Sequence, residues 1–483
     1  MAKPLKILFV TSEAVPFAKV GGLADVSASL PKALVGRGHD VRVLMPFYKC
    51  VKNTGLQFKM VARSVKHRLS GNILGFNLLE TDSEGVKFYF LENNRYFDRE
   101  NVYGPVGGDY VDNALRFGFL DKAVFPTLSA VNFEPDIIHC NDWQTGLIPL
   151  YLKFSEHGRI FKNVKTLFTI HNLAYQGIFE KFYMYMLKIP QQLFRIEGVE
   201  YYGNINFMKS GILYSDAINT VSKKYSEEIM TEDFGAGMEG VLKTREKDLS
   251  GIPNGVDYDI WSPEKDKQIK VNYNRDTLAL KSECKKDLMG YFGVTFDEER
   301  PVLGYVGRFV HQKGIDLLSG IIDRLVELNV FIVILGSGQE RYNAVFKAAA
   351  EKYPAHVRVC HEFNDELSHK IEAGCDIFLM PSRYEPCGLN QMYSVKYGTI
   401  PVVHATGGLD DAIVDFGDDP KNGNGFKFAP PGTEAFLRGI KRALAVYSDK
   451  DAWKRLMQQA MSYDFSWQHS AGEYETLYRK MLL

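Results

Sequence analysis

Short apolar segments alternate along the whole chain with longer segments of helical periodicity. In the first half the apolar segments cover residues 6–10, 41–45, 86–90, 136–140, 166–170 and 217–221. Their length and apolar character predict buried strands. The segment 22–35 has apolar residues at helical spacing, and Pro31 is expected to interrupt that helix. Strand, helix and strand in succession require a right-handed crossover, which predicts a parallel sheet.

The alternation begins again in the second half of the chain. Apolar segments there cover 302–306, 330–335, 357–360, 377–380 and 400–404, with helical segments at 317–328 and 341–351. Between the halves, the run from Ile252 to Asp257 contains Pro, Asn and Gly, as a turn between domains does. We therefore predict an α/β protein of two doubly wound, Rossmann-like domains, 1–252 and 253–465.

Composition excludes several classes of protein. With 483 residues, 45% hydrophobic and 24% charged, the chain is long enough for two or three cores. Its formal charge of -1 gives no general attraction for nucleic acid or an anionic membrane. The six cysteines are scattered, which indicates reduced thiols rather than a zinc site. No segment has the length of a signal peptide or a membrane span, so we expect a cytoplasmic protein.

The loops that follow the strands are the candidate sites, because ligands of open parallel sheets bind beyond the carboxyl ends of the strands. The loop after the first strand contains Lys19, Gly21 and Gly22 just before a helix. Paired glycines allow backbone amides to approach a ligand, and the lysine adds a positive charge. Paired glycines before a helix are also common for structural reasons, and the dinucleotide fingerprint GxGxxG is absent.

Asp142 and His171 follow two further strands of the first predicted sheet. An aspartate in such a position often caps the next helix, and a single histidine is most often structural. Because both residues fall at the carboxyl ends of strands, we expect their side chains to converge on one site.

In the second half, Arg308 and Lys313 lie five residues apart between a strand and a helix. A guanidinium and an ammonium together can neutralise a diphosphate leaving group without a metal, although a solvated basic turn has the same composition. Thr406 and Gly407 follow another strand and offer further amides. The Gly-Ser-Gly run at 336–338 is a weaker signal, because it lacks the spacing of a dinucleotide site.

The loop after the strand 377–380 carries Glu385 between two prolines, and a helix is expected to begin at Gly388. The free amides at a helix start attract anions, whereas Glu385 repels them. A nucleotide sugar fits both, because it has phosphate at one end and polar hydroxyl groups at the other. From this loop alone, a solvated glutamate in an ordinary connection is the alternative.

Several motifs, in their order along the chain, together resemble bacterial glycogen synthase and plant starch synthase. They are Lys-Val-Gly-Gly-Leu-Ala-Asp-Val, His-Asn-Leu-Ala-Tyr-Gln-Gly, Pro-Asn-Gly-Val-Asp, Gly-Arg followed by Gly-Ile-Asp, and Ser-Arg-Tyr-Glu-Pro-Cys-Gly-Leu-Asn-Gln. The resemblance covers nearly the whole chain. It implies a GT-B fold, with two Rossmann-like domains facing across a cleft and a last helix, 466–483, that crosses back to the first domain. It also implies a retaining transfer of glucose from ADP-glucose to the non-reducing end of an α-1,4-glucan such as glycogen, with no metal or other cofactor.

The resemblance also implies roles for individual residues. Glu385 is expected to face the glucosyl ring, and Arg308 and Lys313 are expected to hold the diphosphate. His171 and Asp142 are expected to line the sugar and acceptor side, which completes a set of five catalytic residues. The expected substrate-binding residues are Lys19, Gly21, Gly22, Asn254, Cys387, Gly388, Leu389, Thr406 and Gly407.

This chain departs from many retaining GT-B enzymes at Tyr393, where they have a second acid eight residues after the first. A mechanism on two carboxylates is therefore not expected. A sucrose-synthase-like transferase and a UDP-glucose-dependent glucan synthase are the nearest alternatives, and a glucan phosphorylase would need lysine-bound pyridoxal phosphate. An oxidoreductase would need the missing dinucleotide fingerprint. A non-catalytic glucan-binding protein could use the many aromatic residues, but would not need these charged residues at strand ends.

Overall fold

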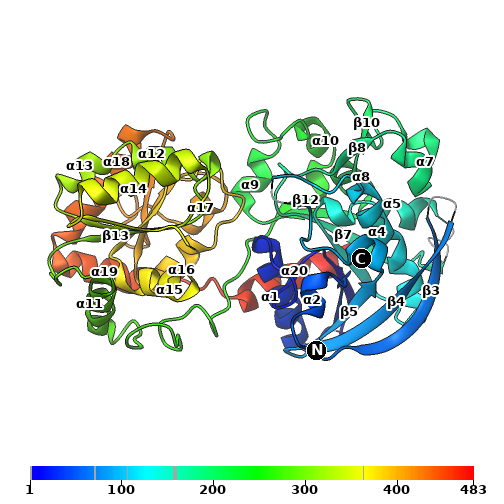
Figure 1. Cartoon of the computed structure of the whole chain (residues 1–483), viewed down its shortest axis with the longest axis horizontal. Helices are drawn as coiled ribbons and strands as arrows, with labels where there is room; N and C mark the ends of the chain where they lie inside the picture. Colours follow the sequence, from blue (N-terminus) through cyan, green and yellow to red (C-terminus); the bar gives the residue numbers. More distant parts are fainter. Residues whose placement is uncertain (1–2, 70–71, 106, 156–159, 363) are drawn as a thin grey trace. The chain divides into compact units, whose positions relative to one another are not determined.

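The computed structural model describes residues 3–69, 72–105, 107–155, 160–362 and 364–483. The chain divides into two compact units (Figure 1). Unit 1 consists of Met1–Val221, Ser226–Gly255 and Trp467–Leu483, and unit 2 consists of Ser222–Tyr225 and Val256–Ser466. In the part of the chain that the structure describes, no helix is both long and apolar enough to span a bilayer.

Unit 1 is built on a nine-stranded sheet in the order β12-β11-β7-β6-β1-β2-β5-β4-β3. Its parallel strands are β12 (Leu249–Gly251), β11 (Ala217–Thr220), β7 (Lys165–Ile170), β6 (Ile137–Asn141), β1 (Lys6–Val10), β2 (Asp40–Pro46) and β5 (Val86–Glu92). Almost every side chain of β1 and β6 is buried, as expected for strands covered on both faces. The predicted parallel sheet is confirmed.

Two features of unit 1 differ from the sequence-based expectation. The sheet continues into an antiparallel pair, β4 (Asn72–Ser83) and β3 (Lys59–Leu69), which carries too many polar residues to be predicted as buried strands. Helix α1 (Gly22–Gly36) runs through Pro31 without interruption. Pro31 is buried, and the burial of this helix face outweighs the one backbone hydrogen bond that proline removes.

The last helix, α20 (Trp467–Met481), is part of unit 1 and packs against α1. Its inner face carries two buried tyrosines that bind to polar groups of the central strands. The hydroxyl of Tyr474 accepts a hydrogen bond from Asn219 (3.0 Å), and that of Tyr478 lies 2.7 Å from His139 Nδ1. These contacts fix the chain terminus on the core of the unit that contains the N-terminus.

Unit 2 contains a six-stranded parallel sheet in the order β15-β14-β13-β16-β17-β18. The strands are β13 (Val302–Val306), β14 (Phe331–Leu335), β15 (Val357–Cys360), β16 (Ile377–Met380), β17 (Ile400–His404) and β18 (Phe426–Phe428). Helices α12 (Ile315–Ser319), α13 (Ile322–Val326) and α14 (Glu340–Lys352) lie on one face, and α11 (Lys281–Tyr291), α15 (Asp365–Gly374) and α16 (Asn390–Lys396) lie on the other (Figure 1). The second predicted sheet is confirmed. The predicted single helix 317–328 is wrong, because it breaks at Gly320 into two short helices.

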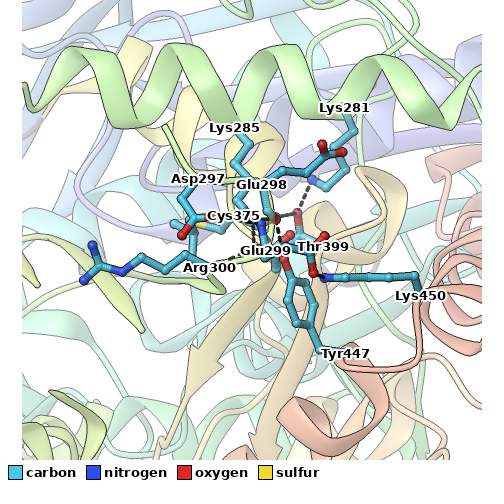
Figure 2. Close-up of polar contacts among 12 residues, drawn as sticks. Lys281, Lys285, Asp297, Glu298, Glu299, Arg300, Cys375, Thr399, Tyr447 and Lys450 are labelled. Atoms are coloured by element: carbon cyan, nitrogen blue, oxygen red, sulfur yellow. Dashed lines mark hydrogen bonds and ion pairs between the residues drawn. The ribbon is translucent and has the colours of Figure 1, made fainter. Parts of the chain in front are cut away.

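A buried polar cluster links the amino ends of β13 and β16 through hydrogen bonds and an ion pair (Figure 2). Lys285 Nζ contacts Asp376 Oδ2, the backbone oxygen of Glu298 and the hydroxyl of Tyr447, each at 2.9 Å. Asp376 in turn accepts a hydrogen bond from the amide of Val302 (2.8 Å). The neighbouring Lys281 donates to Ala373 and Thr399, and burial lowers its pKa to about 8. The cluster lies at the end of the sheet opposite to the loops of the candidate site.

Candidate active site

Two loops of unit 2 that are far apart in sequence lie side by side. Residues 307–314 follow β13 and residues 381–389 follow β16, and these two strands are neighbours in the sheet. The amide of Arg383 donates to the oxygen of Gln312 (2.8 Å), and the Arg383 guanidinium pairs with Asp316 (2.6 Å). The sheet topology therefore brings together the two basic residues and the acid that the sequence singled out.

Gly314 allows the two loops to pack closely. Its φ of +62° is in the left-handed region, and a Cβ at this position would lie 1.8 Å from the oxygen of Pro381. Any other residue would be strained at this φ and would clash with Pro381 unless the backbone moved. The glycine is therefore needed for contact between the loops.

Lys313 and Glu385 form an ion pair at the centre of this arrangement. Lys313 Nζ lies 2.5 Å from Glu385 Oε2, and the hydroxyl of Ser382 donates to the same oxygen (3.0 Å). Only 8% of the Glu385 side chain is exposed, against 24% for Lys313. The acid is thus held in a defined orientation by a partner that remains partly accessible.

Arg308 lies on the same loop as Lys313, but its environment differs. The residue is exposed, and among the described residues no ion pair holds its guanidinium. Its backbone oxygen accepts a hydrogen bond from the buried Tyr305 hydroxyl (3.3 Å). The loop therefore presents one cation bound to an acid and one cation that is available to an anion.

A third loop, which follows β17, contacts the Glu385 segment through its backbone. The amide of Gly408 donates to the oxygen of Glu385 (3.0 Å), and a Cβ on Gly408 would lie 2.0 Å from the oxygen of Cys387. Thr406 and Gly407 precede this contact and are buried, with Gly407 the first residue of the short helix α17 (Gly407–Ala412). The paired glycines of this loop thus serve contact between loops.

The helix expected from Gly388 begins two residues later. Gly388 has a φ of +72°, Leu389 is the N-cap, and α16 covers seven residues from Asn390. Gly388, in the left-handed region, lies outside this helix, so the predicted start was wrong. Cys387 is buried, and its backbone oxygen accepts a hydrogen bond from the Gln391 side chain (3.0 Å).

The Gly-Ser-Gly run at 336–338 is explained by packing. Gly336 has a φ of +155°, and its Cβ would lie 1.9 Å from the oxygen of Gly307. The amide of Phe309 donates to the oxygen of Ser337 (2.8 Å). This run packs against the backbone of the Arg308 loop and accepts a hydrogen bond from it.

Tyr393, at the position of the second acid in many GT-B enzymes, is used for packing. Its ring stacks on Trp261 with 4.1 Å between centroids and 2° between planes. His369 stacks on Trp261 at 3.7 Å, and Asp266 pairs with His369 (2.7 Å). This aromatic stack holds α16, the helix that follows the Glu385 loop, against the segment that opens unit 2.

In unit 1, Asp142 and His171 are brought together as expected. Asp142 Oδ1 accepts a hydrogen bond from the His171 amide (2.7 Å), and Asp142 itself has a φ of +55°. Its side chain does not cap the short helix that follows, which removes the capping alternative. Burial raises the pKa of Asp142 to about 7.

The His171 imidazole is neutral. Burial lowers its pKa to about 3, and its Nε2 lies 2.9 Å from Asn141 Oδ1. The Asn141 amide is oriented by its own hydrogen bond to the oxygen of Val10 (3.0 Å). Asn141, which ends β6, was not among the predicted site residues, because a lone asparagine at a strand end carries no distinctive pattern.

The backbone of the loop that contains Lys19 is hydrogen-bonded to Glu13, a residue that the sequence motifs did not reveal. Glu13 is buried and accepts hydrogen bonds from the amides of Val20 (2.5 Å) and Gly21 (3.0 Å). Lys19 is exposed and pairs with Asp25 (2.8 Å). A Cβ on Gly21 or Gly22 would meet no atom of the described residues within 4 Å, so packing does not explain these two glycines.

Asn254 ends the set of predicted site residues. It is buried in unit 1, and its Oδ1 has no hydrogen-bond partner among the described residues. Within the same described ranges, no group of three or more His, Cys, Asp or Glu is arranged to hold a metal ion. All six cysteines are free thiols.

Family models match both halves of the chain. The starch synthase catalytic domain matches residues 6–244, and glycosyl transferases group 1 matches residues 292–459. A glycogen synthase from Geotalea daltonii is 45% identical over 99% of both chains. A glycogen synthase from Moorella thermoacetica is 45% identical over 100% of this chain and 98% of its own.

Solved structures show the same likeness. The catalytic domain of starch synthase IV from Arabidopsis thaliana, bound to ADP and acarbose, superposes with a TM-score of 0.91. It is 32% identical, over 99% of this chain and 100% of that chain. Sucrose-phosphate synthase from Thermosynechococcus elongatus has a TM-score of 0.61 at 18% identity, over 98% of both chains, and shares the fold.

Proposed function

Since the chain belongs to the glycogen and starch synthase family of GT-B glycosyltransferases, we propose that it transfers glucose from ADP-glucose to the non-reducing end of an α-1,4-glucan, with retention of anomeric configuration. The observation that carries this proposal is the Lys313–Glu385 pair beside the exposed Arg308. One acid and two cations at the ends of adjacent strands suit a substrate that has a diphosphate at one end and a sugar at the other.

Charge development explains the need for two cations. Cleavage of the anomeric bond leaves negative charge on the departing diphosphate, so Arg308 and Lys313 stabilise the transition state more than the bound donor. Arg308 is available to oxygen atoms of the phosphates. Lys313 has to leave Glu385 for a phosphate oxygen, or contact both groups, when the donor binds. The two side chains supply the charge that a metal supplies in other transferases, so the proposal includes no metal or other cofactor.

Glu385 is assigned to the sugar. Its carboxylate stabilises the positive charge that develops on the glucosyl ring as the bond breaks. Tyr393 offers no second carboxylate, and His171, whose Nε2 is bound to Asn141 Oδ1, is not assigned as a nucleophile. Departure and attack on the same face, without a covalent glucosyl-enzyme, therefore fit this set of residues.

The remaining predicted residues are proposed to bind substrate. Lys19, with Gly21 and Gly22, is assigned to the donor, and His171 and Asp142 are assigned to the sugar and the incoming acceptor. Asn254, whose buried Oδ1 has no hydrogen-bond partner in the described part of the chain, is assigned to a polar group of the ligand. The other assigned donor contacts are Cys387, Gly388, Leu389, Thr406 and Gly407.

The test is transfer of label into polymer. The protein is incubated with glycogen and either ADP-[14C]glucose or UDP-[14C]glucose, and label is counted in the precipitated glucan. Label from ADP-glucose, released as maltose by an exo-acting β-amylase, is the expected result, because that enzyme cleaves α-1,4 bonds from non-reducing ends. Label from UDP-glucose alone would contradict the donor assignment, and no label from either donor would contradict the function. The Glu385→Gln variant serves as the inactive control.

A further inference from the structure

Glu13 is a buried carboxylate three residues beyond the end of β1. Only 3% of the residue is exposed. Its Oε2 accepts hydrogen bonds from the amides of Val20 (2.5 Å) and Gly21 (3.0 Å), and its Oε1 accepts one from the hydroxyl of Tyr103 (2.9 Å). Both oxygens are thus used, which offsets the cost of burying the charge.

The residues that Glu13 holds are themselves exposed. Lys19, Val20, Gly21 and Gly22 all lie at the surface of unit 1, and Val20 is 60% exposed. A segment with two glycines and few packed side chains has little to fix its conformation. The carboxylate of Glu13 supplies two of the contacts that do so.

Tyr103 connects this carboxylate to a second segment. Its hydroxyl contacts Ser12 Oγ (2.8 Å) as well as Glu13. Lys19, Val20 and Tyr103 all line one cavity of about 410 Å³. Glu13 therefore holds, through two backbone amides, a segment that lines this cavity together with Tyr103.

We propose that Glu13 is a positioning residue, which holds the Lys19–Gly22 segment in the conformation that binds the nucleotide-sugar donor. The inference rests on the proposed function for the role of Lys19, but the anchoring itself does not. Because the Gly21 amide points to Glu13, the donor meets the Lys19 side chain and the open space above the glycines rather than that amide.

The protonation of Glu13 gives a second consequence. Burial raises its pKa, although the two backbone amides and Tyr103 lower it. Among the described groups, those that face it are Asp25 on α1, Asp142 after β6, Tyr103 and the buried Tyr48, while Lys19 is paired with Asp25. A proton on Glu13 weakens the hydrogen bonds from Val20 and Gly21, so the segment loosens as pH falls.

The experiment compares wild type with Glu13→Gln, Glu13→Asp and a control, Asp216→Asn. Asp216 also binds a backbone amide, that of Thr166 (2.8 Å), but at the amino end of β7. Amide hydrogen exchange of Val20 and Gly21 is measured first, followed by KM and kcat for ADP-glucose over a series of falling pH values. Loss of the charge-assisted hydrogen bonds is expected to change KM for ADP-glucose by about tenfold to a hundredfold.

The proposal predicts faster exchange at Val20 and Gly21 in Glu13→Gln, and a rise in KM for ADP-glucose of about tenfold or more, with a smaller change in kcat. It also predicts that the wild-type KM rises as pH falls and that this rise is weaker in Glu13→Gln. Glu13→Asp keeps the charge on a shorter side chain, so its exchange rates and its KM should lie between those of wild type and Glu13→Gln. Asp216→Asn should match wild type in both. The proposal would be overturned by unchanged exchange at Val20 and Gly21 in both Glu13 variants. It would also be overturned by a KM of Glu13→Gln within twofold of wild type. If wild type itself transfers no glucose from ADP-glucose, the proposed function fails, and exchange at Val20 and Gly21 still decides whether Glu13 anchors the segment.

Discussion

Lys313 and Glu385 are 72 positions apart in the sequence, and their charged atoms lie 2.5 Å apart. Each is assigned to a different end of the donor, so the pair that forms without ligand has to open or be shared when the donor binds. The ion pair, with the hydrogen bond from Ser382, holds a nearly buried acid in one orientation until then. It also makes Lys313 a residue with two roles, one in the free enzyme and one in the transition state.

Replacement of Lys313 by Ala is expected to lower kcat by about 10²- to 10³-fold, the usual effect of losing one preorganised charged donor. It also leaves Glu385 with Ser382 as a side-chain partner, which should reduce the free energy of unfolding by about 1–3 kcal/mol. Steady-state kinetics and urea denaturation measure the two effects. Lys347, an exposed lysine on α14, provides the control, and Lys347→Ala should change neither. A kcat within tenfold of wild type in Lys313→Ala would contradict the assignment.

Replacement of Gly314 by Ala tests the contact between the two loops. The added Cβ would lie 1.8 Å from the oxygen of Pro381 at a φ that alanine disfavours. We expect a loss of more than about 1 kcal/mol in the free energy of unfolding, together with a large fall in kcat. The matched control is Gly290→Ala in α11, where a Cβ would meet no atom of the described ranges within 4 Å. That change should leave activity intact and stabilise the helix by up to about 1 kcal/mol, so equal effects at both positions would refute the loop-packing argument.

The sequence predicted the central strands well because they are buried on both faces. Strands such as β13 and β16 are uniformly apolar and bounded by turn residues, so their limits follow from the sequence. The antiparallel strands β3 and β4 are long and largely polar, and their pairing depends on partners distant in the chain. The fold class and the family resemblance drawn from the motifs are confirmed, whereas these edge strands could not be derived from local pattern.

The candidate site was predictable in its location but not in its contacts. Position at the carboxyl ends of strands was enough to select Arg308, Lys313 and Glu385, because sheet topology decides where those ends meet. The direct pairing of Lys313 with Glu385, and the reason for Gly314, depend on side-chain and loop geometry that no local pattern encodes. Glu13 was missed because a single glutamate after a strand resembles any surface acid.

Asp142 should make stability depend on pH. Its pKa is about 7 in the folded protein, against an ordinary value of about 4. Folding thus favours the protonated form, and the resulting stabilisation is complete below about pH 4 and is lost as pH rises to about 7. The unfolding free energy of wild type relative to Asp142→Asn should therefore fall between pH 5 and pH 8. Because His171 is present in both proteins, its opposite contribution cancels, and a difference that is constant with pH would contradict the raised pKa.

The buried cluster at the other end of the unit 2 sheet should govern stability rather than activity. Lys285 and Asp376 form a pair with side chains only 6% and 12% exposed (Figure 2 shows Lys285 and its other partners). Lys285→Met leaves the charge of Asp376 buried and unpaired, which typically reduces the free energy of unfolding by about 3–5 kcal/mol. The double variant Lys285→Met with Asp376→Asn should recover part of that loss, because no charge remains unpaired.

The kinetic outcome separates this cluster from the candidate site. Asp376 and Val302 are joined at the amino ends of β16 and β13, whereas Glu385 and Arg308 follow the carboxyl ends of the same strands. The folded fraction of Lys285→Met should therefore retain kcat within about twofold of wild type. The control is Lys352→Met, which breaks an exposed pair with Asp323 and should not measurably change stability. A large loss of kcat in Lys285→Met at full folding would mean that the two ends of the sheet are coupled, because no contact of Lys285 reaches the Glu385 loop directly among the described residues.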